Sequence, residues 1–348
     1  MKTHFLFPAI ITVLLLPSAG CCGRTPQIKG PNAISELIAV EIGDMKQWVL
    51  IRGSDKANPI LLWLHGGPGA GQIPVARHFN GDKAGTASLE DIFVVVHWDQ
   101  RGAGKSNPRG FDVETMTQER FIEDVVTLTQ LLKKRFDRDR IYLLGHSWGT
   151  QLGAQVVNRR PQDYKAFISV SPVIDQYEAH HVGFAWAYEE ATRRGDQRTL
   201  RRLEALDGPP FATHDDFIKY IRIIGNYGGG PDIGMLRLAM IALQAPEYCL
   251  RDYFQWFSGS NRGSGPMWQE TRDFRLVDTV DQFELPVFFI CGRKDYNTPG
   301  KLVEDNWEHI QAPHKELVWF EQSAHVPFMA DPQKFKDVLV HVRDALER

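Results

Sequence analysis

The sequence predicts an α/β protein whose core is a mostly parallel, doubly wound sheet. Short, continuous apolar runs recur along the chain, and such runs are typical of strands buried on both faces of a parallel sheet. Helical segments alternate with them, after an initial pair of strands that reads as a hairpin. One apolar run leads directly into Gly145–Gly149, where a serine stands between two glycines.

The expected strands can be placed in chain order. Two strands flank the turn Gly43-Asp44, and six apolar runs follow. The clearest helices are Thr117–Phe136, with apolar side chains along one face, and the segment Pro332–Leu346 near the C-terminus. The expected strands are Ile34–Glu41, Gln47–Ile51, Ile60–Leu64, Ile92–Trp98, Ile141–Leu144, Ala166–Val170, Val287–Cys291 and Leu317–Phe320.

The alternation is interrupted after the sixth expected strand. Residues 173–283 have a helical pattern and hold 16 of the 38 aromatic residues of the chain. An insertion at this point can cover the edge of the sheet at which the serine between the two glycines lies. We therefore expect a helical cap over 173–283 and a core formed by 34–172 and 284–348. The aromatic side chains could wall an apolar pocket or form the core of the cap itself.

The first 20 residues have the composition of a secretory signal peptide. Lys2 is their one charged residue, and the apolar run Phe5–Leu16 and the small residues Pro17–Gly20 follow it. Residues 21–33 read as a linker. Ala19-Gly20-Cys21 resembles the end of a bacterial lipobox, which implies lipid attachment at Cys21, and ordinary cleavage without a lipid is the alternative. We expect an exported protein, either in the bacterial cell envelope, lipid-anchored or periplasmic, or secreted.

Gly145–Gly149 has the G-x-S-x-G pattern of a nucleophile elbow. In such an elbow a sharp strand-to-helix turn lifts the serine above the edge of the sheet, and glycines are needed where a Cβ would collide with neighbouring backbone. The strand Ile141–Leu144 precedes the pattern and a helix over Gln151–Arg160 can follow it. Ser147 is therefore the candidate nucleophile.

A serine nucleophile needs a general base and an acid that orients the base. Asp295 follows the strand Val287–Cys291, and His325 follows the strand Leu317–Phe320. Both lie on loops at the carboxyl ends of strands, the edge that also carries Ser147. The chain order Ser147, Asp295, His325 predicts a catalytic triad.

An oxyanion hole requires two N–H donors. The first candidate is Trp148, the residue after the nucleophile. The second comes from the glycine-rich loop His65-Gly66-Gly67-Pro68-Gly69, where we favour Gly67 with Gly66 as the alternative. His65 is interpreted as a structural hydrogen-bonding residue.

Three motifs together carry a family resemblance. The segments His65–Gly69, Trp98–Ser106 and Ser147–Gly149 resemble the prolyl aminopeptidase (proline iminopeptidase) family of α/β-hydrolases. The resemblance covers about 34–172 and 284–347. It implies an α/β-hydrolase fold and removal of N-terminal residues, especially proline, by a serine mechanism that needs no cofactor or metal.

Two departures concern specificity. The family's elbow usually has glycine where this chain has His146, as many esterases do, and the family's cap motif Trp-x-x-Trp-Glu is replaced by Trp186–Glu190. Glu189 and Glu190 are the candidate partners for a substrate ammonium group, and a solvated helix face is the other interpretation.

The leading hypothesis is a serine hydrolase that cleaves a small amide or an N-terminal peptide bond. A carboxylesterase or lactonase with the same triad is the alternative, and a catalytically silent binding lipoprotein is a third. The formal net charge of −3 with mixed signs does not point to nucleic acid, so the expected partner is a small molecule or a short peptide.

Overall fold

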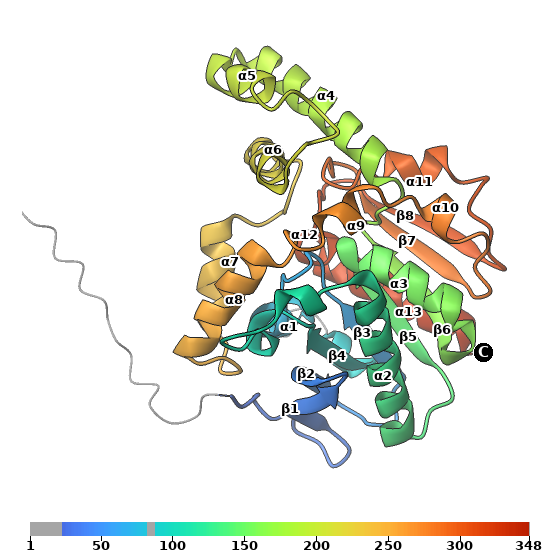
Figure 1. Ribbon diagram of the computed structural model, residues 1–348. Helices are drawn as coiled ribbons and strands as arrows, with labels where there is room; N and C mark the ends of the chain where they lie inside the picture. Colours follow the sequence, from blue (N-terminus) through green and yellow to red (C-terminus); the bar gives the residue numbers. More distant parts are fainter. Residues whose placement is uncertain (1–22, 82–87, 348) are drawn as a thin grey trace, which may run out of the picture.

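The computed structural model describes residues 23–81 and 88–347 and is built around one eight-stranded sheet (Figure 1). The strand order is β1-β2-β4-β3-β5-β6-β7-β8. Antiparallel pairing joins β1 to β2 and β2 to β4, and every other neighbouring pair is parallel. The expected mostly parallel sheet is therefore confirmed. The strands are β1 Ile34–Ile42, β2 Met45–Gly53, β3 Ile60–Leu64, β4 Val94–Asp99, β5 Ile141–His146, β6 Tyr164–Val170, β7 Val287–Gly292 and β8 Lys315–Phe320.

Helices cover both faces of the sheet because successive strand residues point to opposite sides. In β3, Leu62 and Leu64 join the core cluster under α2, α3, α10 and α11, whereas Leu61 and Trp63 join the cluster under α1, α12 and α13. The covering helices are α1 Ile73–Phe79, α2 Gln118–Phe136, α3 Trp148–Arg159, α10 Leu276–Thr279, α11 Lys301–Asp305, α12 Pro327–Ala330 and α13 Pro332–Leu346.

The two longest core helices begin at residues suited to helix starts. Thr117 accepts a hydrogen bond on its side chain from the N–H of Arg120 and so caps α2. Asp331 caps α13 by accepting from the N–H of Lys334, and Pro332 occupies the first helical turn, where no N–H is needed. Short 3₁₀ helices complete the connections: η1 Leu89–Asp91, η2 Gly104–Ser106, η3 Val113–Thr115 and η4 Pro161–Asp163.

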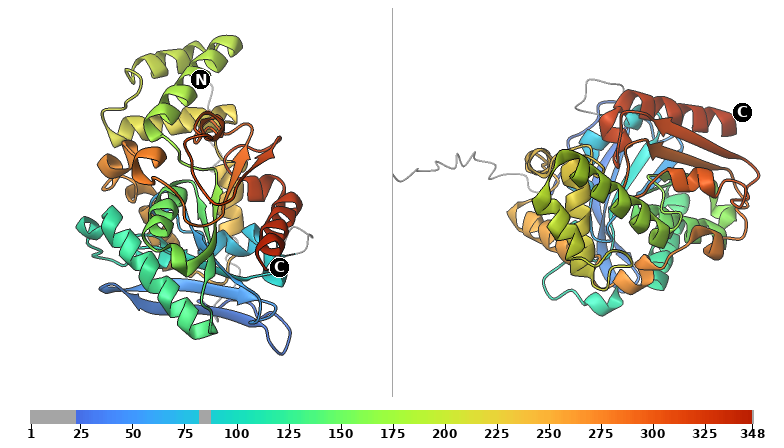
Figure 2. Two further views of the ribbon diagram at one scale, coloured as in Figure 1. Left: turned by 90° about the vertical axis from the view of Figure 1, so that its right-hand side faces the viewer. Right: turned by 90° about the horizontal axis from the view of Figure 1, so that it is seen from above.

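The insertion between β6 and β7 has two parts that pack differently. Helices α4 to α6 surround an aromatic cluster of their own, and Figures 1 and 2 show α4 and α5 projecting away from the sheet. Helices α7 and α8 pack instead on the core cluster under α1. The helices of the insertion, apart from α10, are α4 Gln176–Arg194, α5 Gln197–Glu204, α6 His214–Tyr227, α7 Met235–Ala242, α8 Leu250–Arg262 and α9 Trp268–Arg272.

Polar contacts fasten the second part of the insertion to the core. Lys105 forms an ion pair with Asp252 at the start of α8, with the two side chains 7% and 2% exposed. The Tyr248 hydroxyl donates a hydrogen bond to Asp99, the last residue of β4. Across residues 23–81 and 88–347, no helix has the length and apolar character needed to cross a membrane. The expected signal peptide lies outside the described residues.

Candidate active site

Ser147 occupies a strained turn between β5 and α3. Its φ of 56° and ψ of −127° lie in a region that side chains other than glycine rarely adopt. A Cβ added at Gly145 would lie 2.3 Å from the Gly149 carbonyl oxygen, and one added at Gly149 would lie 2.4 Å from the Leu64 carbonyl oxygen. Only glycine fits at both positions. The following helix begins at Trp148, three residues before the expected start at Gln151.

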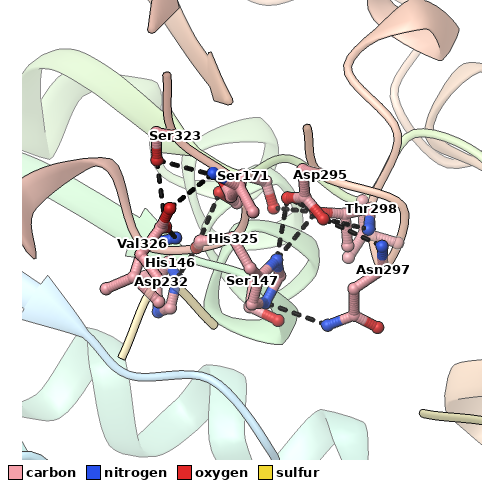
Figure 3. A network of polar contacts seen from close by, with 12 residues as sticks. His146, Ser147, Ser171, Asp232, Asp295, Asn297, Thr298, Ser323, His325 and Val326 are labelled. Atoms are coloured by element: carbon pink, nitrogen blue, oxygen red, sulfur yellow. Dashed lines mark hydrogen bonds and ion pairs between the residues drawn. The ribbon is translucent and has the colours of Figure 1, made fainter. Parts of the chain in front are cut away.

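Asp295 and His325 are joined by a buried hydrogen bond. The His325 Nδ1 lies 2.8 Å from Asp295 Oδ2, and the side chains are 7% and 1% exposed. Asp295 Oδ1 accepts from the N–H groups of Asn297 and Thr298, and Oδ2 also accepts from the Thr298 hydroxyl. These donors hold the carboxylate in place (Figure 3). Because an ionised carboxylate only accepts hydrogen bonds, Nδ1 of His325 carries the proton.

The other ring nitrogen of His325 is an acceptor. The side-chain amide of Asn297 donates to Nε2 over 3.1 Å. Ser147 and His325 line the same cavity, together with Asn297 and Thr298. The structure thus brings the three predicted triad residues to one place, with the histidine tautomer that a general base requires.

Two further histidines beside the triad are buried and neutral. His146 Nε2 donates to the carbonyl oxygen of His325 over 2.9 Å, and burial lowers the pKa of His146 to about 3. His65 donates from Nδ1 to the Gly66 carbonyl and accepts the Gln100 N–H at Nε2. Burial lowers the pKa of His65 to about 4. Both rings therefore act as hydrogen-bonding supports of the loops around Ser147.

The residues expected to supply the oxyanion donors line the same cavity as the serine. Trp148 is the first residue of α3, so its N–H has no carbonyl acceptor within the helix. A Cβ on Gly66 would lie 2.9 Å from the Ser147 Cβ, and Gly67 has a φ of +114° that favours glycine. Gly66, Gly67 and Trp148 line the cavity with Ser147.

The insertion between β6 and β7 supplies a contact that the sequence analysis missed. Asp232 Oδ1 accepts from the N–H of Ala324 over 2.6 Å, and Oδ2 accepts from the N–H of Val326 over 2.7 Å. The Gly230 carbonyl accepts the N–H of His325 itself. The loop before α7 is therefore hydrogen-bonded to the backbone on both sides of the triad histidine (Figure 3). An aspartate directly after the Gly-Gly-Gly-Pro break was the available signal.

The cavity beside Ser147 has a volume of about 410 Å³. Among the described residues that line it, none is Asp, Glu, Lys or Arg, and the polar lining consists mostly of amides and hydroxyls. Aromatic side chains from the insertion form part of the wall, namely Phe217, Trp256, Phe257 and Trp268. The site is therefore shaped for an uncharged or largely apolar group.

The structure does not bring Glu189 or Glu190 to this cavity. Glu190 forms ion pairs with Arg193 and Arg194 of its own helix α4, and Glu189 is exposed. These arginines lower the pKa of Glu190 to about 2. Trp186 stacks on Tyr296 with ring centroids 4.0 Å apart and does not line the cavity. The arginines of the same helix, and not the cavity, therefore provide the charged partners of Glu190.

Comparison with known proteins identifies the family. The chain is 30% identical over 313 residues to a probable aminopeptidase, YbaC, of Bacillus subtilis (strain 168), and the match covers 88% of this chain and 96% of the relative. The chain belongs to the prolyl aminopeptidase-like α/β-hydrolases. The model of the family described as "Serine aminopeptidase, S33" matches residues 89–205.

A further relative agrees with this family, and a solved structure agrees with the fold. A proline iminopeptidase of Heyndrickxia coagulans is 25% identical over 290 residues, covering 81% of this chain and 88% of the relative. The crystal structure of a proline iminopeptidase of Mycobacterium smegmatis superposes with a TM-score of 0.59 at 20% identity, covering 88% of this chain and 97% of that chain. The expected α/β-hydrolase fold and hydrolase class are confirmed.

Proposed function

We propose that the protein cleaves a small amide or an N-terminal peptide bond through an acyl-enzyme formed on Ser147. One observation carries the proposal: Ser147, on its strained elbow, shares a cavity with His325, whose Nδ1 donates to the buried Asp295. The printed names of the relatives, a probable aminopeptidase and a proline iminopeptidase, support an amide substrate.

The proposed reaction assigns one task to each residue. Ser147 Oγ attacks the carbonyl carbon while His325 Nε2 takes the hydroxyl proton, and the N–H groups of Trp148 and Gly67 stabilise the negative oxygen. His325 then gives the proton to the leaving amine. In the second half His325 Nε2 takes a proton from water, the water oxygen attacks the acyl carbon, and the proton passes to Ser147 Oγ as the acid product leaves. Asp295 keeps the imidazole oriented throughout. Because Nε2 has a single lone pair, the Asn297 amide must release it before Ser147 can donate.

Turnover measurements on two variants test this proposal. Ser147→Ala and His325→Ala should each lower kcat by at least about a thousandfold, because the triad acts as a unit. Each variant should keep the unfolding transition of the wild type. A Ser147→Ala enzyme with full activity would remove the assignment.

A carboxylesterase or lactonase activity is the second candidate. The specific observation in its favour is the cavity, whose described lining residues include no carboxylate to pair with an α-ammonium group. Burying such a charge without a partner costs free energy, whereas an ester or a lactone carries no charge to bury.

A matched substrate panel separates the two candidates. Proline arylamide, its N-acetylated counterpart and a short-chain aryl ester should be compared by kcat/KM. Preference for the free amine supports the aminopeptidase proposal, whereas cleavage of the ester alone supports the esterase.

We also propose that the protein is exported, either to the bacterial cell envelope, where it is lipid-anchored at Cys21 or periplasmic, or out of the cell by secretion. The support is the sequence pattern of residues 1–21, which lie outside the described residues. Mass spectrometry of the native N-terminus is the test. An intact Met1 in the mature native protein would refute export, and an unmodified Cys21 would refute only the lipid.

A further inference from the structure

Exposed apolar side chains are concentrated on α7 and α8. In the described part of the chain, ten large apolar or aromatic side chains are exposed, and seven of them lie between positions 235 and 257. The other three are Leu131, Tyr177 and Tyr188, at 40–45% exposure. We call the seven the α7–α8 apolar surface: Met235, Leu236, Met240, Leu243, Leu250, Phe254 and Phe257.

The spacing shows that this surface comprises two helix faces. Leu236, Met240 and Leu243 follow the spacing i, i+4 and i+7, which places them on one face of α7. Leu250, Phe254 and Phe257 follow the same spacing on α8. Toward the core, α8 carries the buried Tyr253 and Trp256, and α7 carries the buried Ala242. Each helix is therefore apolar both toward the core and toward the outside, with Leu236 at 77% and Leu250 at 72% exposure. Exposed apolar patches of this kind mark interaction sites.

The α7–α8 apolar surface adjoins the candidate active site. Met235 and Phe257 belong to the surface and also line the cavity that contains Ser147. Figures 1 and 2 show α7 and α8 together at one edge of the molecule, and the Tyr253 hydroxyl donates to the Ala242 carbonyl and so ties the two helices. An occupant of the surface would therefore lie beside the cavity.

The N-terminal end of the described chain is attached to the same place. Gly23 donates its N–H to the carbonyl of Pro246, in the turn between α7 and α8, and Thr25 donates its hydroxyl to Glu247. The 22 residues that precede Gly23 include the apolar run Phe5–Leu16 and Cys21. Any membrane attachment at Cys21 would therefore act close to the apolar surface.

Among the side chains described on α7, α8 and the turn between them, the exposed charged ones are cationic. Across α7, α8 and the turn between them, the two acidic residues, Glu247 and Asp252, are buried, while Arg237 and Arg251 are exposed. Apolar side chains flanked by cations are the composition that binds the interface of an anionic bilayer. We propose that the α7–α8 apolar surface docks on an anionic phospholipid bilayer.

Vesicle partitioning of the full chain tests this inference. Leu236→Ser/Leu250→Ser/Phe254→Ser changes three members of the surface that do not line the cavity. Its partition coefficient onto vesicles of phosphatidylcholine and phosphatidylglycerol should fall at least roughly tenfold below that of the wild type. The reason is that the variant lacks three apolar side chains that the wild type would transfer from water into the bilayer. Pure phosphatidylcholine vesicles should bind the wild type less strongly because they lack the anionic lipid.

The matched control uses the other exposed apolar side chains, in Leu131→Ser/Tyr177→Ser/Tyr188→Ser. It should partition within about twofold of wild type, since these positions lie outside the surface. All three proteins share the N-terminal residues, so a difference between them reports the surface alone. Equal partitioning of the three proteins would overturn the proposal. A change in sedimentation from dimer to monomer in the surface variant, with vesicle binding unchanged, would also overturn it and would indicate an interface between copies.

Discussion

The nucleophile depends on positions where even one methyl group does not fit. Gly145 and Gly149 pack against backbone atoms, which cannot rotate away as a side chain can. Ser147 is thereby held at a φ of 56°, with its N–H bonded to the Val170 carbonyl of the neighbouring strand. The strain at the serine is balanced by the packing of β5 and α3 around it.

Gly149→Ala should destabilise the protein by about 1–3 kcal/mol, because the added Cβ overlaps the Leu64 backbone. Gly225→Ala in α6 is the matched control, since a Cβ there meets nothing within 4 Å. The control should be neutral or stabilising by up to about 1 kcal/mol. Urea denaturation measures both, and an unchanged midpoint for Gly149→Ala would contradict the steric account.

Asp232 is expected to act as a positioning residue. Asp232→Ala should lower kcat roughly tenfold or more, because two charge-assisted hydrogen bonds to the backbone around His325 are lost. KM should change little, since Asp232 does not line the cavity. Asp232→Asn should retain part of the activity through its remaining acceptor oxygen.

The control for this prediction is Asp281→Ala at an exposed aspartate. The pH dependence of kcat/KM should shift in Asp232→Ala and stay as in wild type for the control, because only the former disturbs the histidine. If Asp232→Ala changes stability alone, with kcat and the pH profile intact, the cap loop does not position the histidine.

At the scale of elements, the helices of the insertion form two groups that are held in place by different apolar clusters. Helices α4 to α6 hold together through their own aromatic cluster, whereas α7 and α8 share the core cluster under α1. The buried ion pair between Lys105 and Asp252 joins α8 to the core. The Lys105 Nζ also lies 4.6 Å from the centroid of the Trp48 ring.

Lys105→Met should lower the free energy of unfolding by about 3 kcal/mol, because Asp252 would remain buried without its cation. Lys301→Met is the matched control: its pair with Asp305 is exposed, and its loss should cost less than about 1 kcal/mol. Equal effects in thermal unfolding would show that burial does not distinguish the two pairs.

The strands and the elbow of the core could be predicted because each is determined mainly by a pattern in its own short stretch of sequence. Six continuous apolar runs and the hairpin turn at Gly43-Asp44 marked the eight strands, and the glycines around Ser147 marked the elbow. The packing of the insertion was harder to predict from the sequence, because its helices carry apolar residues on more than one face. The orientation of Glu190 was set by neighbouring arginines on its own helix, and the role of Asp232 required a contact across 92 residues of sequence to Ala324.

Across the whole molecule, four buried histidines determine the response to acid. Burial lowers the pKa of His65 and His180 to about 4 and of His97 and His146 to about 3, from an ordinary value of 6.5. Asp99 has the opposite effect, because burial raises its pKa to about 7. Below pH 6.5 the unfolded chain binds protons that the folded histidines do not, whereas Asp99 binds a proton more readily in the folded state.

The histidines outnumber the aspartate, so stability should fall as the pH falls through 6.5. Each histidine contributes a slope of up to about 1.4 kcal/mol per pH unit, and Asp99 offsets about one of them. Urea denaturation between about pH 7 and pH 5 measures the sum. His97→Gln should reduce the slope. A free energy of unfolding that stays constant or rises on acidification would contradict this balance.

The measurement that most directly tests the central claim is covalent labelling with a fluorophosphonate followed by peptide mass mapping. The wild-type enzyme should gain one adduct, on the peptide that contains Ser147, because this serine occupies the elbow and shares its cavity with His325, whose Nδ1 donates to the buried Asp295. Ser147→Ala should gain none. Labelling at another serine, or undiminished labelling of Ser147→Ala, would contradict the assignment of Ser147 as the nucleophile.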